Sequence, residues 1–245
     1  MKFTVLGGSG LVGSQVVERL RAAGHEVVPA SLSSGVDVLS GKGLDQALAG
    51  TDVVINLTNS PTFDEASIGF FETSMRNIGA AAEAAGVRHS VILSIVGVEK
   101  VPRLDYYLAK VAQENALKNG SVPYSIVHAT QFYEFVQGIM SMTTDGDTVR
   151  LPSTPVQPIA AADVAAAVAG TASEAPLQGT RSIAGPDVFT LDELGRITLT
   201  ARPDGRSVVT DEEAGMFAVV PGDVLTAPED AYIAPTHYRD WLQQS

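Results

Sequence analysis

The sequence predicts an α/β fold in which a doubly wound parallel sheet is accompanied by a small C-terminal lobe. Short apolar runs alternate with helical periodicity through the first half of the chain, which is typical of parallel strands joined by crossover helices. The right-handed crossover rule then gives a sheet with helices on both faces. After about residue 130 the prolines Pro152, Pro155 and Pro158 cluster and the alternation is lost, which indicates a separate lobe.

Each expected strand is a short apolar run bounded by turn residues. These runs are residues 3–6, 25–29, 52–57, 89–94 and 124–127. Aliphatic residues at helical spacing predict helices that begin at Leu11, cover 44–48 and 70–85, and run from Asp105 to Lys118. We expect Asp105 and Asp163 to cap their helices. The core should comprise about 1–130 plus 156–185, and the lobe about 131–155 and 186–245, within one domain spanning 1–245.

Composition excludes several classes of protein. The 245 residues include 16 Lys and Arg against 28 Asp and Glu, a net charge of −12, so nucleic acid and anionic membranes are not expected partners. Cysteine is absent and the four histidines are scattered, so we expect no metal site, disulfide or cysteine nucleophile. The first apolar run breaks at Gly7 without a cleavage pattern, which favours a cytoplasmic protein.

A glycine-rich segment, GGSGLVG at 7–13, separates the first strand from the first helix. Its G-x-x-G-x-x-G spacing lets the backbone turn tightly and approach a pyrophosphate, while the amides at the helix start face the negative charge. An ordinary glycine turn is the alternative. The strand–turn–helix context favours dinucleotide binding and a Rossmann-type sheet.

The residues after the second strand bear on the choice of cofactor. NAD is held by a carboxylate at this place, whereas this chain offers Ser31, Ser33 and Ser34, with nothing acidic before Asp37. Hydroxyl groups suit an anionic 2′-phosphate, so NADP(H) is favoured over NAD(H). The alternative is that the serines are ordinary loop residues. Asp37 falls where a further strand would pass the adenine ring, and it would accept a hydrogen bond from the amino group of that ring.

A tyrosine and a lysine, Tyr106 and Lys110, are four residues apart and therefore share one helix face. Ser94 ends the preceding strand, where open α/β sheets bind ligands. These three residue types suit the reduction of a carbonyl group. A tyrosine near an ammonium group can donate its proton as the hydride reaches the carbonyl carbon, and a serine can hydrogen-bond the substrate oxygen. The alternative is a surface pair between Lys110 and Glu114.

With these motifs in order along nearly the whole chain, the sequence resembles the short-chain dehydrogenase/reductase superfamily, and most closely its atypical, NmrA-like NAD(P)H-binding branch. Further matching segments are LSIVGVE at 93–99, YYLAKVAQENAL at 106–117 and VPYSIVHATQFYEF at 122–135. Arginines that are common in the family are replaced here by Leu32 and His128. The resemblance implies catalytic roles for Ser94, Tyr106 and Lys110. It also implies cofactor contacts from Gly7, Ser9, Gly10, Leu11, Val12, Gly13, Leu57, Thr58, Asn59, Ala129 and Thr130.

Two aromatic residues, Phe132 and Tyr133, follow the last core strand and are candidates for an apolar substrate pocket. The alternative is core packing. We therefore expect an NAD(P)H-dependent oxidoreductase that passes hydride to a small or mid-sized apolar carbonyl or quinone, with the C-terminal lobe as substrate lobe. The competing hypothesis is a non-catalytic NADP(H)-sensing regulator that binds protein partners.

Overall fold

The computed structural model describes residues 1–244, which divide into two compact units. Unit 1 comprises Met1–His128 and Val164–Arg181, and unit 2 comprises Ala129–Asp163 and Ser182–Ser245. A seven-stranded sheet has the strand order β12-β9-β5-β4-β3-β1-β2. Its strands are β1 (Lys2–Leu6), β2 (Glu26–Ala30), β3 (Val53–Asn56), β4 (His89–Ile95), β5 (Tyr124–Ala129), β9 (Gly179–Ala184) and β12 (Tyr232–Ile233).

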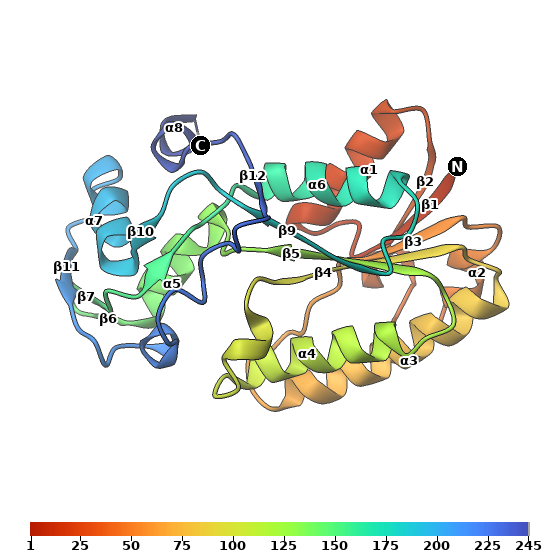
Figure 1. Ribbon diagram of the computed structural model, residues 1–245, viewed down its shortest axis with the longest axis horizontal. Coiled ribbons are helices and arrows are strands. Elements are labelled where there is room, and N and C mark those ends of the chain that lie inside the picture. Colours follow the sequence, from red (N-terminus) through yellow and green to blue (C-terminus); the bar gives the residue numbers. More distant parts are fainter. Residues whose placement is uncertain (245) are drawn as a thin grey trace. The chain divides into compact units, whose positions relative to one another are not determined.

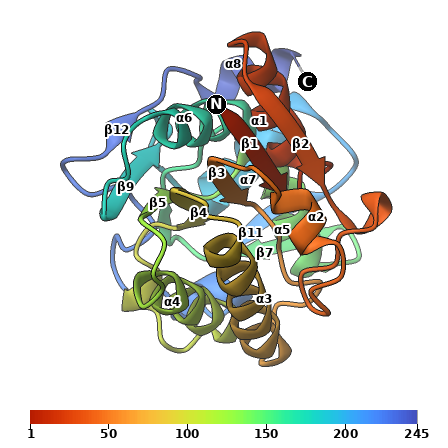
Figure 2. The ribbon, with the colours of Figure 1, turned by 90° about the vertical axis from the view of Figure 1, so that its right-hand side faces the viewer.

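Helices cover both faces of the sheet in unit 1. The helices are α1 (Leu11–Ala22), α2 (Leu44–Leu48), α3 (Ala66–Ala84), α4 (Asp105–Lys118) and α6 (Ala161–Ser173). Figures 1 and 2 show α3 and α4 side by side on one face, with α1 and α6 on the other. The pairs β1–β2, β1–β3 and β3–β4 are parallel. The predicted doubly wound, Rossmann-type α/β fold is confirmed.

Apolar periodicity builds the core on one side of the sheet. Strands β1, β2 and β3 contribute Leu6, Ala30 and Val54, all of them buried, to a cluster with helices α2 and α3. Leu48 of α2 and Ile78 of α3 complete the contact. Burial of this kind is worth about 1.5–3 kcal/mol for each large aliphatic side chain, so the pattern that predicted the elements also stabilises them.

Three predicted boundaries are wrong. Helix α3 begins at Ala66, four residues before its predicted start, because Ser67 is buried with its hydroxyl bonded to Thr62 O. Helix α4 is preceded by Leu104 with no side-chain cap, so Asp105 lies inside the helix. Helix α6 begins at Ala161, whose amide donates to both carboxylate oxygens of Glu134 (3.2 and 3.1 Å).

The strand expected at Asp37 is also absent. Residues 35–43 turn, because Gly35, Gly41 and Gly43 have positive φ values of 83, 77 and 78°, a region in which glycine is favoured. The Asp37 carboxylate accepts from the amide of Leu39 (2.9 Å) and the hydroxyl of Ser40 (2.7 Å), which lowers its pKa.

Unit 2 is assembled from short elements. They are η3 (Tyr133–Phe135), α5 (Val136–Met142), β6 (Thr144–Asp145), β7 (Thr148–Leu151), β8 (Pro155–Val156), β10 (Phe189–Thr190), α7 (Leu191–Ala201), β11 (Ser207–Thr210), η4 (Met216–Val219) and α8 (Tyr238–Gln244). Strand β7 pairs parallel with β11 and antiparallel with β6. Tyr133, Tyr238 and Trp241 pack their rings together at centroid distances of 4.8 to 5.9 Å, which gives unit 2 an aromatic centre.

Candidate active site

The glycine loop joins β1 to α1, and its glycines are sterically required. Gly7 has φ +79°, and a Cβ there would lie 2.8 Å from Leu57 O. A Cβ at Gly13 would lie 2.1 Å from Gly7 O, far inside van der Waals contact. Gly10 closes the turn, because its amide donates to Gly7 O over 3.0 Å. Any side chain at Gly7 or Gly13 would therefore displace the loop backbone.

The start of α1 provides the donors that an anion requires. The amide of Ser14 donates to Gly10 O over 3.0 Å, at the first turn of the helix. The amides of the residues before Ser14 in this turn therefore have no acceptor within the helix. The first turn contains no acidic residue, while Ser9, Gly10 and Leu11 are exposed. A helix start with open amides and no opposing charge fits a dinucleotide pyrophosphate.

The serines after β2 form a compact local turn, the 3-10 helix η1 (Leu32–Ser34). Ser34 Oγ accepts from the Ser31 amide and donates to Ser31 O, each at 2.9 Å, and the hydroxyls of Ser31 and Ser33 are 2.8 Å apart. Leu32 is 76% exposed. These bonds satisfy the serines within the loop, yet Ser33 and Ser34 remain accessible to a ligand.

Leu57, Thr58 and Asn59 follow β3 at its carboxyl end. Thr58 donates both its amide (3.1 Å) and its hydroxyl (2.6 Å) to Asn56 Oδ1, which fixes the start of this loop. Asn59 Oδ1 accepts the hydroxyl hydrogen of Tyr106 over 2.5 Å. The loop after β3 and the first turn of α4 are therefore joined at the candidate acid.

Tyr106 is half-buried, and two rings from its own unit pack around it. Phe63 lies 4.9 Å from the Tyr106 ring and Phe71 lies 6.1 Å from it, between centroids. Burial raises the pKa of Tyr106 to about 12. The phenol therefore keeps its proton at neutral pH.

Lys110 is one helical turn further along α4 and is buried, with 5% of its surface exposed. Its Nζ donates to Leu93 O over 2.7 Å and to Gln113 Oε1, and lies 4.8 Å from the centroid of the Phe71 ring. Burial lowers the pKa of Lys110 to about 7, and the charge of Glu114 opposes the shift. Lys110 Nζ is thus held at the backbone oxygen of Leu93, near the carboxyl end of β4.

Ser94 donates its hydroxyl to a buried carboxylate that the sequence did not single out as a site residue. Ser94 Oγ lies 2.6 Å from Glu114 Oε1, and His128 Nε2 donates to the same oxygen over 2.7 Å. Lys118 Nζ donates to Glu114 Oε2 over 3.0 Å. The alternative of a surface pair between Lys110 and Glu114 is wrong, because both side chains are buried and Glu114 pairs elsewhere.

Replacement of Glu114 by Gln should remove an acid-sensitive part of the stability. Burial alone would raise the pKa of Glu114, but hydrogen bonds from His128, Ser94 and Lys118 lower it from 4.5 to about 2. A lowered carboxyl pKa stabilises the fold above about pH 4.5, and about 3 kcal/mol is lost as the pH falls toward 2. Urea unfolding between pH 2.5 and 7 should therefore show a steeper loss for the wild type than for Glu114→Gln. Exposed Glu83→Gln is the matched control, and parallel curves for all three proteins would contradict the assignment.

The tertiary structure thus gives each predicted catalytic residue a different partner. Tyr106 bonds to Asn59, Lys110 to Leu93 O and Gln113, and Ser94 to Glu114. Gln113 and Glu114 were missed as site residues. The available signal was their spacing, three and four residues after Lys110, which places them on the same helix face.

The remaining predicted residues belong to unit 2. Ala129 and Thr130 are buried, and Thr130 Oγ1 has no hydrogen-bond partner among the described residues. Phe132 stacks on Phe135 at 5.2 Å. Tyr133 is buried and donates its hydroxyl to Thr236 O over 2.7 Å, as a core residue of unit 2 would.

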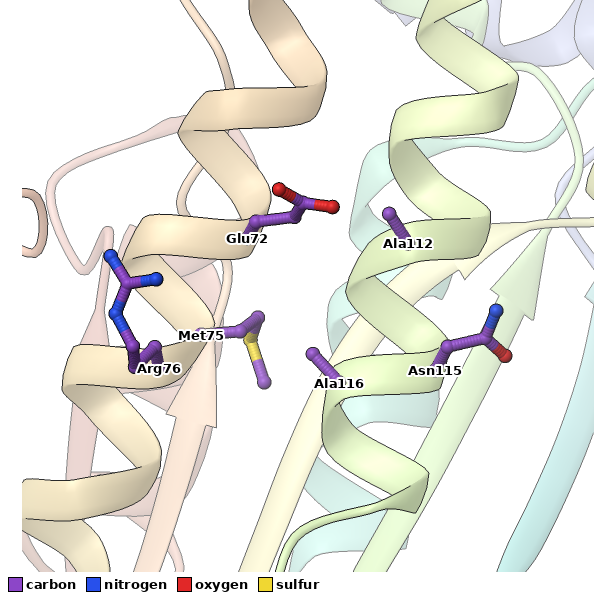
Figure 3. A pocket seen from close by; sticks show the side chains of 6 residues that line it. All are labelled: Glu72, Met75, Arg76, Ala112, Asn115 and Ala116. Carbon is purple, nitrogen blue, oxygen red and sulfur yellow. The ribbon is translucent and has the colours of Figure 1, made fainter.

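A pocket of about 470 Å³ lies between α3 and α4. Glu72, Met75 and Arg76 line it from α3, and Ala112, Asn115 and Ala116 from α4 (Figure 3). None of its lining residues is a predicted site residue. Within residues 1–244, no three His, Cys, Asp or Glu side chains gather as metal ligands, and no helix is long and apolar enough to cross a bilayer.

Comparisons with known proteins identify a family and a relative. Residues 7–175 match the model of a family described as NAD(P)H-binding. A (4-alkanoyl-5-oxo-2,5-dihydrofuran-3-yl)methyl phosphate reductase of Streptomyces griseus subsp. griseus is 35% identical over 142 residues, which are 52% of this chain and 47% of that protein. The chain thus aligns with about half the length of this curated relative.

Solved structures share the fold at low sequence identity. The triphenylmethane reductase of Citrobacter sp., complexed with NADP(H), superposes with a TM-score of 0.74 at 19% identity, covering 100% of this chain and 99% of that one. The NADPH-dependent quinone oxidoreductase of Escherichia coli, complexed with NADPH, gives a TM-score of 0.66 at 21% identity, covering 85% and 77%.

Proposed function

The chain belongs to the NAD(P)H-binding family, and on that premise we propose that it is a reductase of the short-chain type that uses NADP(H). The family match confirms the NAD(P)H binding that the resemblance implied, and the solved structures share the fold. Its substrate, in this proposal, is a small or mid-sized apolar carbonyl compound or quinone. The observation that carries the proposal is the half-buried, protonated phenol of Tyr106, held in the same unit as the closed glycine loop.

The glycine loop is the proposed pyrophosphate site. Gly7, Gly10 and Gly13 let the backbone approach the ligand, and the amides at the start of α1 would face its charge. The exposed hydroxyls of Ser33 and Ser34 support a 2′-phosphate, since no carboxylate precedes Asp37 after β2. NADP(H) is therefore the proposed cofactor.

NADP(H) should bind more tightly than NAD(H). In this proposal the hydroxyl hydrogens of Ser33 and Ser34 turn from Ser31 to a 2′-phosphate, which NAD(H) lacks. The dissociation constant for NADPH should therefore be at least about tenfold lower than that for NADH, or about 1.4 kcal/mol. Isothermal titration with both dinucleotides measures the ratio. The double variant Ser33→Ala/Ser34→Ala should reduce the ratio, whereas Ser173→Ala, a helix serine bonded to Ala169 O, should leave it unchanged. Equal affinities in the wild type would contradict the preference.

In the proposed reaction, a dinucleotide held by the glycine loop would supply the hydride that the carbonyl carbon receives. Tyr106 gives its phenolic proton to the carbonyl oxygen, so that the C=O bond becomes an alcohol. Lys110 at the carboxyl end of β4 favours the phenolate that remains, provided it is charged, which its pKa of about 7 allows at neutral or lower pH. Ser94 hydrogen-bonds the substrate oxygen once its hydroxyl hydrogen turns from Glu114.

A panel of acceptors tests the proposal. NADPH oxidation is followed with quinones, aldehydes and ketones, and with an alkanoyl-substituted oxodihydrofuran phosphate of the kind that the Streptomyces relative's name describes. Turnover with at least one carbonyl or quinone is the expected result. Tight, redox-selective NADP(H) binding with no turnover on any acceptor would instead favour the sensing regulator.

A further inference from the structure

The loop after β3 holds the proposed acid directly. Asn59 is exposed in this loop, and its Oδ1 accepts the hydroxyl hydrogen of Tyr106 over 2.5 Å, between residues 47 positions apart. The resemblance to known reductases assigned Asn59 to the dinucleotide instead. The hydrogen bond therefore gives Asn59 a partner other than the dinucleotide, namely Tyr106.

Local hydrogen bonds fix the position of this amide. The amide of Ser60 also donates to Asn59 Oδ1, over 3.0 Å, so both lone pairs of that oxygen are engaged. Ser60 is buried and its Oγ accepts from the amide of Thr62 over 3.3 Å. Thr62 O in turn accepts from the buried hydroxyl of Ser67 in α3 over 2.7 Å. Asn59 is thus anchored to β3 on one side and to α3 on the other.

The Tyr106 ring has little freedom to place its oxygen elsewhere. Phe63 and Phe71 pack against it at centroid distances of 4.9 and 6.1 Å. With the ring held by these contacts, the hydroxyl group can turn only about its own C–O bond. The acceptor that faces it therefore decides where the proton points.

We propose that Asn59 is a positioning residue for Tyr106, which holds the phenolic proton until a substrate oxygen replaces Oδ1 as its acceptor. An uncharged amide suits this role, because a carboxylate in its place would hold the proton more strongly and oppose formation of the phenolate. The role rests on the proposed reductase function. Asn59 Oδ1 could accept from a ribose hydroxyl only by displacing one of its two present donors.

A double-mutant cycle tests the proposal in the full chain. Wild type, Asn59→Ala, Tyr106→Phe and the double variant are compared for NADPH dissociation constant, melting temperature and turnover of the best acceptor. Asn59→Ala should lower kcat about 10- to 100-fold, while the KM and dissociation constant for NADPH stay within about twofold. In the Tyr106→Phe background it should lower residual turnover no further, and the two melting-temperature shifts should be less than additive. Asn115→Ala, exposed on α4, should match the wild type in every measurement.

Three results would overturn the role of Asn59 alone. The first is an unchanged kcat in Asn59→Ala when the wild type is active. The second is that the melting-temperature shifts of the two single variants add in the double variant. The third is a loss of NADPH affinity of tenfold or more in Asn59→Ala that Tyr106→Phe does not share. A wild type that is silent on every acceptor would overturn the proposed function itself, and the catalytic role of Asn59 with it. In that case the NADPH dissociation constants and the melting temperatures still distinguish a contact of Asn59 with Tyr106 from a contact with the cofactor.

Discussion

Tyr106→Phe should reduce turnover by at least about 100-fold, because it removes the only proton that the proposed reaction delivers to the substrate oxygen. The phenol is protonated at neutral pH, since burial raises its pKa to about 12, and it can therefore act as the acid. The ring contacts with Phe63 and Phe71 remain available to phenylalanine, so the fold should tolerate the change.

The measurement separates chemistry from binding. The rate of NADPH oxidation should fall at saturating acceptor, while the dissociation constant for NADPH stays within about twofold, because the loss appears only in the transition state. Tyr124→Phe removes a phenolic oxygen from a half-buried tyrosine in β5 and is the matched control. Turnover of Tyr106→Phe at the wild-type rate would show that another group is the acid.

Gly13→Ala should weaken both NADP(H) binding and the fold. The added Cβ would lie 2.1 Å from Gly7 O, a backbone atom that cannot rotate away, so the glycine loop must shift. Overpacking of this kind costs about 1–3 kcal/mol. The same shift moves the amides that would face the pyrophosphate, so the affinity for NADPH should fall at least about tenfold.

Gly79→Ala is the matched control for this variant. Gly79 lies within α3, and a Cβ there would meet nothing within 4 Å. Alanine in a helix interior is favoured over glycine by roughly 0.5–1 kcal/mol, so this variant should melt slightly higher and bind NADPH normally. Thermal unfolding and isothermal titration on both variants give the comparison. A Gly13→Ala protein with unaltered melting and affinity would exclude the loop as the dinucleotide site.

Local features that repeat along the chain could be predicted from the sequence. Helix α1 begins at Leu11 and α2 spans Leu44–Leu48 as predicted, because apolar spacing and a preceding glycine specify them within a few residues. The strand at Asp37 was wrongly expected, since three glycines with positive φ turn the chain there.

The sequence by itself determined the α/β class, the glycine loop and the helix face shared by Tyr106 and Lys110, because each depends on neighbours only a few positions apart. Only the tertiary structure decided that Asn59 faces Tyr106 and that Glu114 faces Ser94 and His128. These partners are 14 to 47 positions apart, and they meet because strand order and helix packing bring them together. The protonation states of the candidate site follow from the same packing, since burial and hydrogen bonding set them.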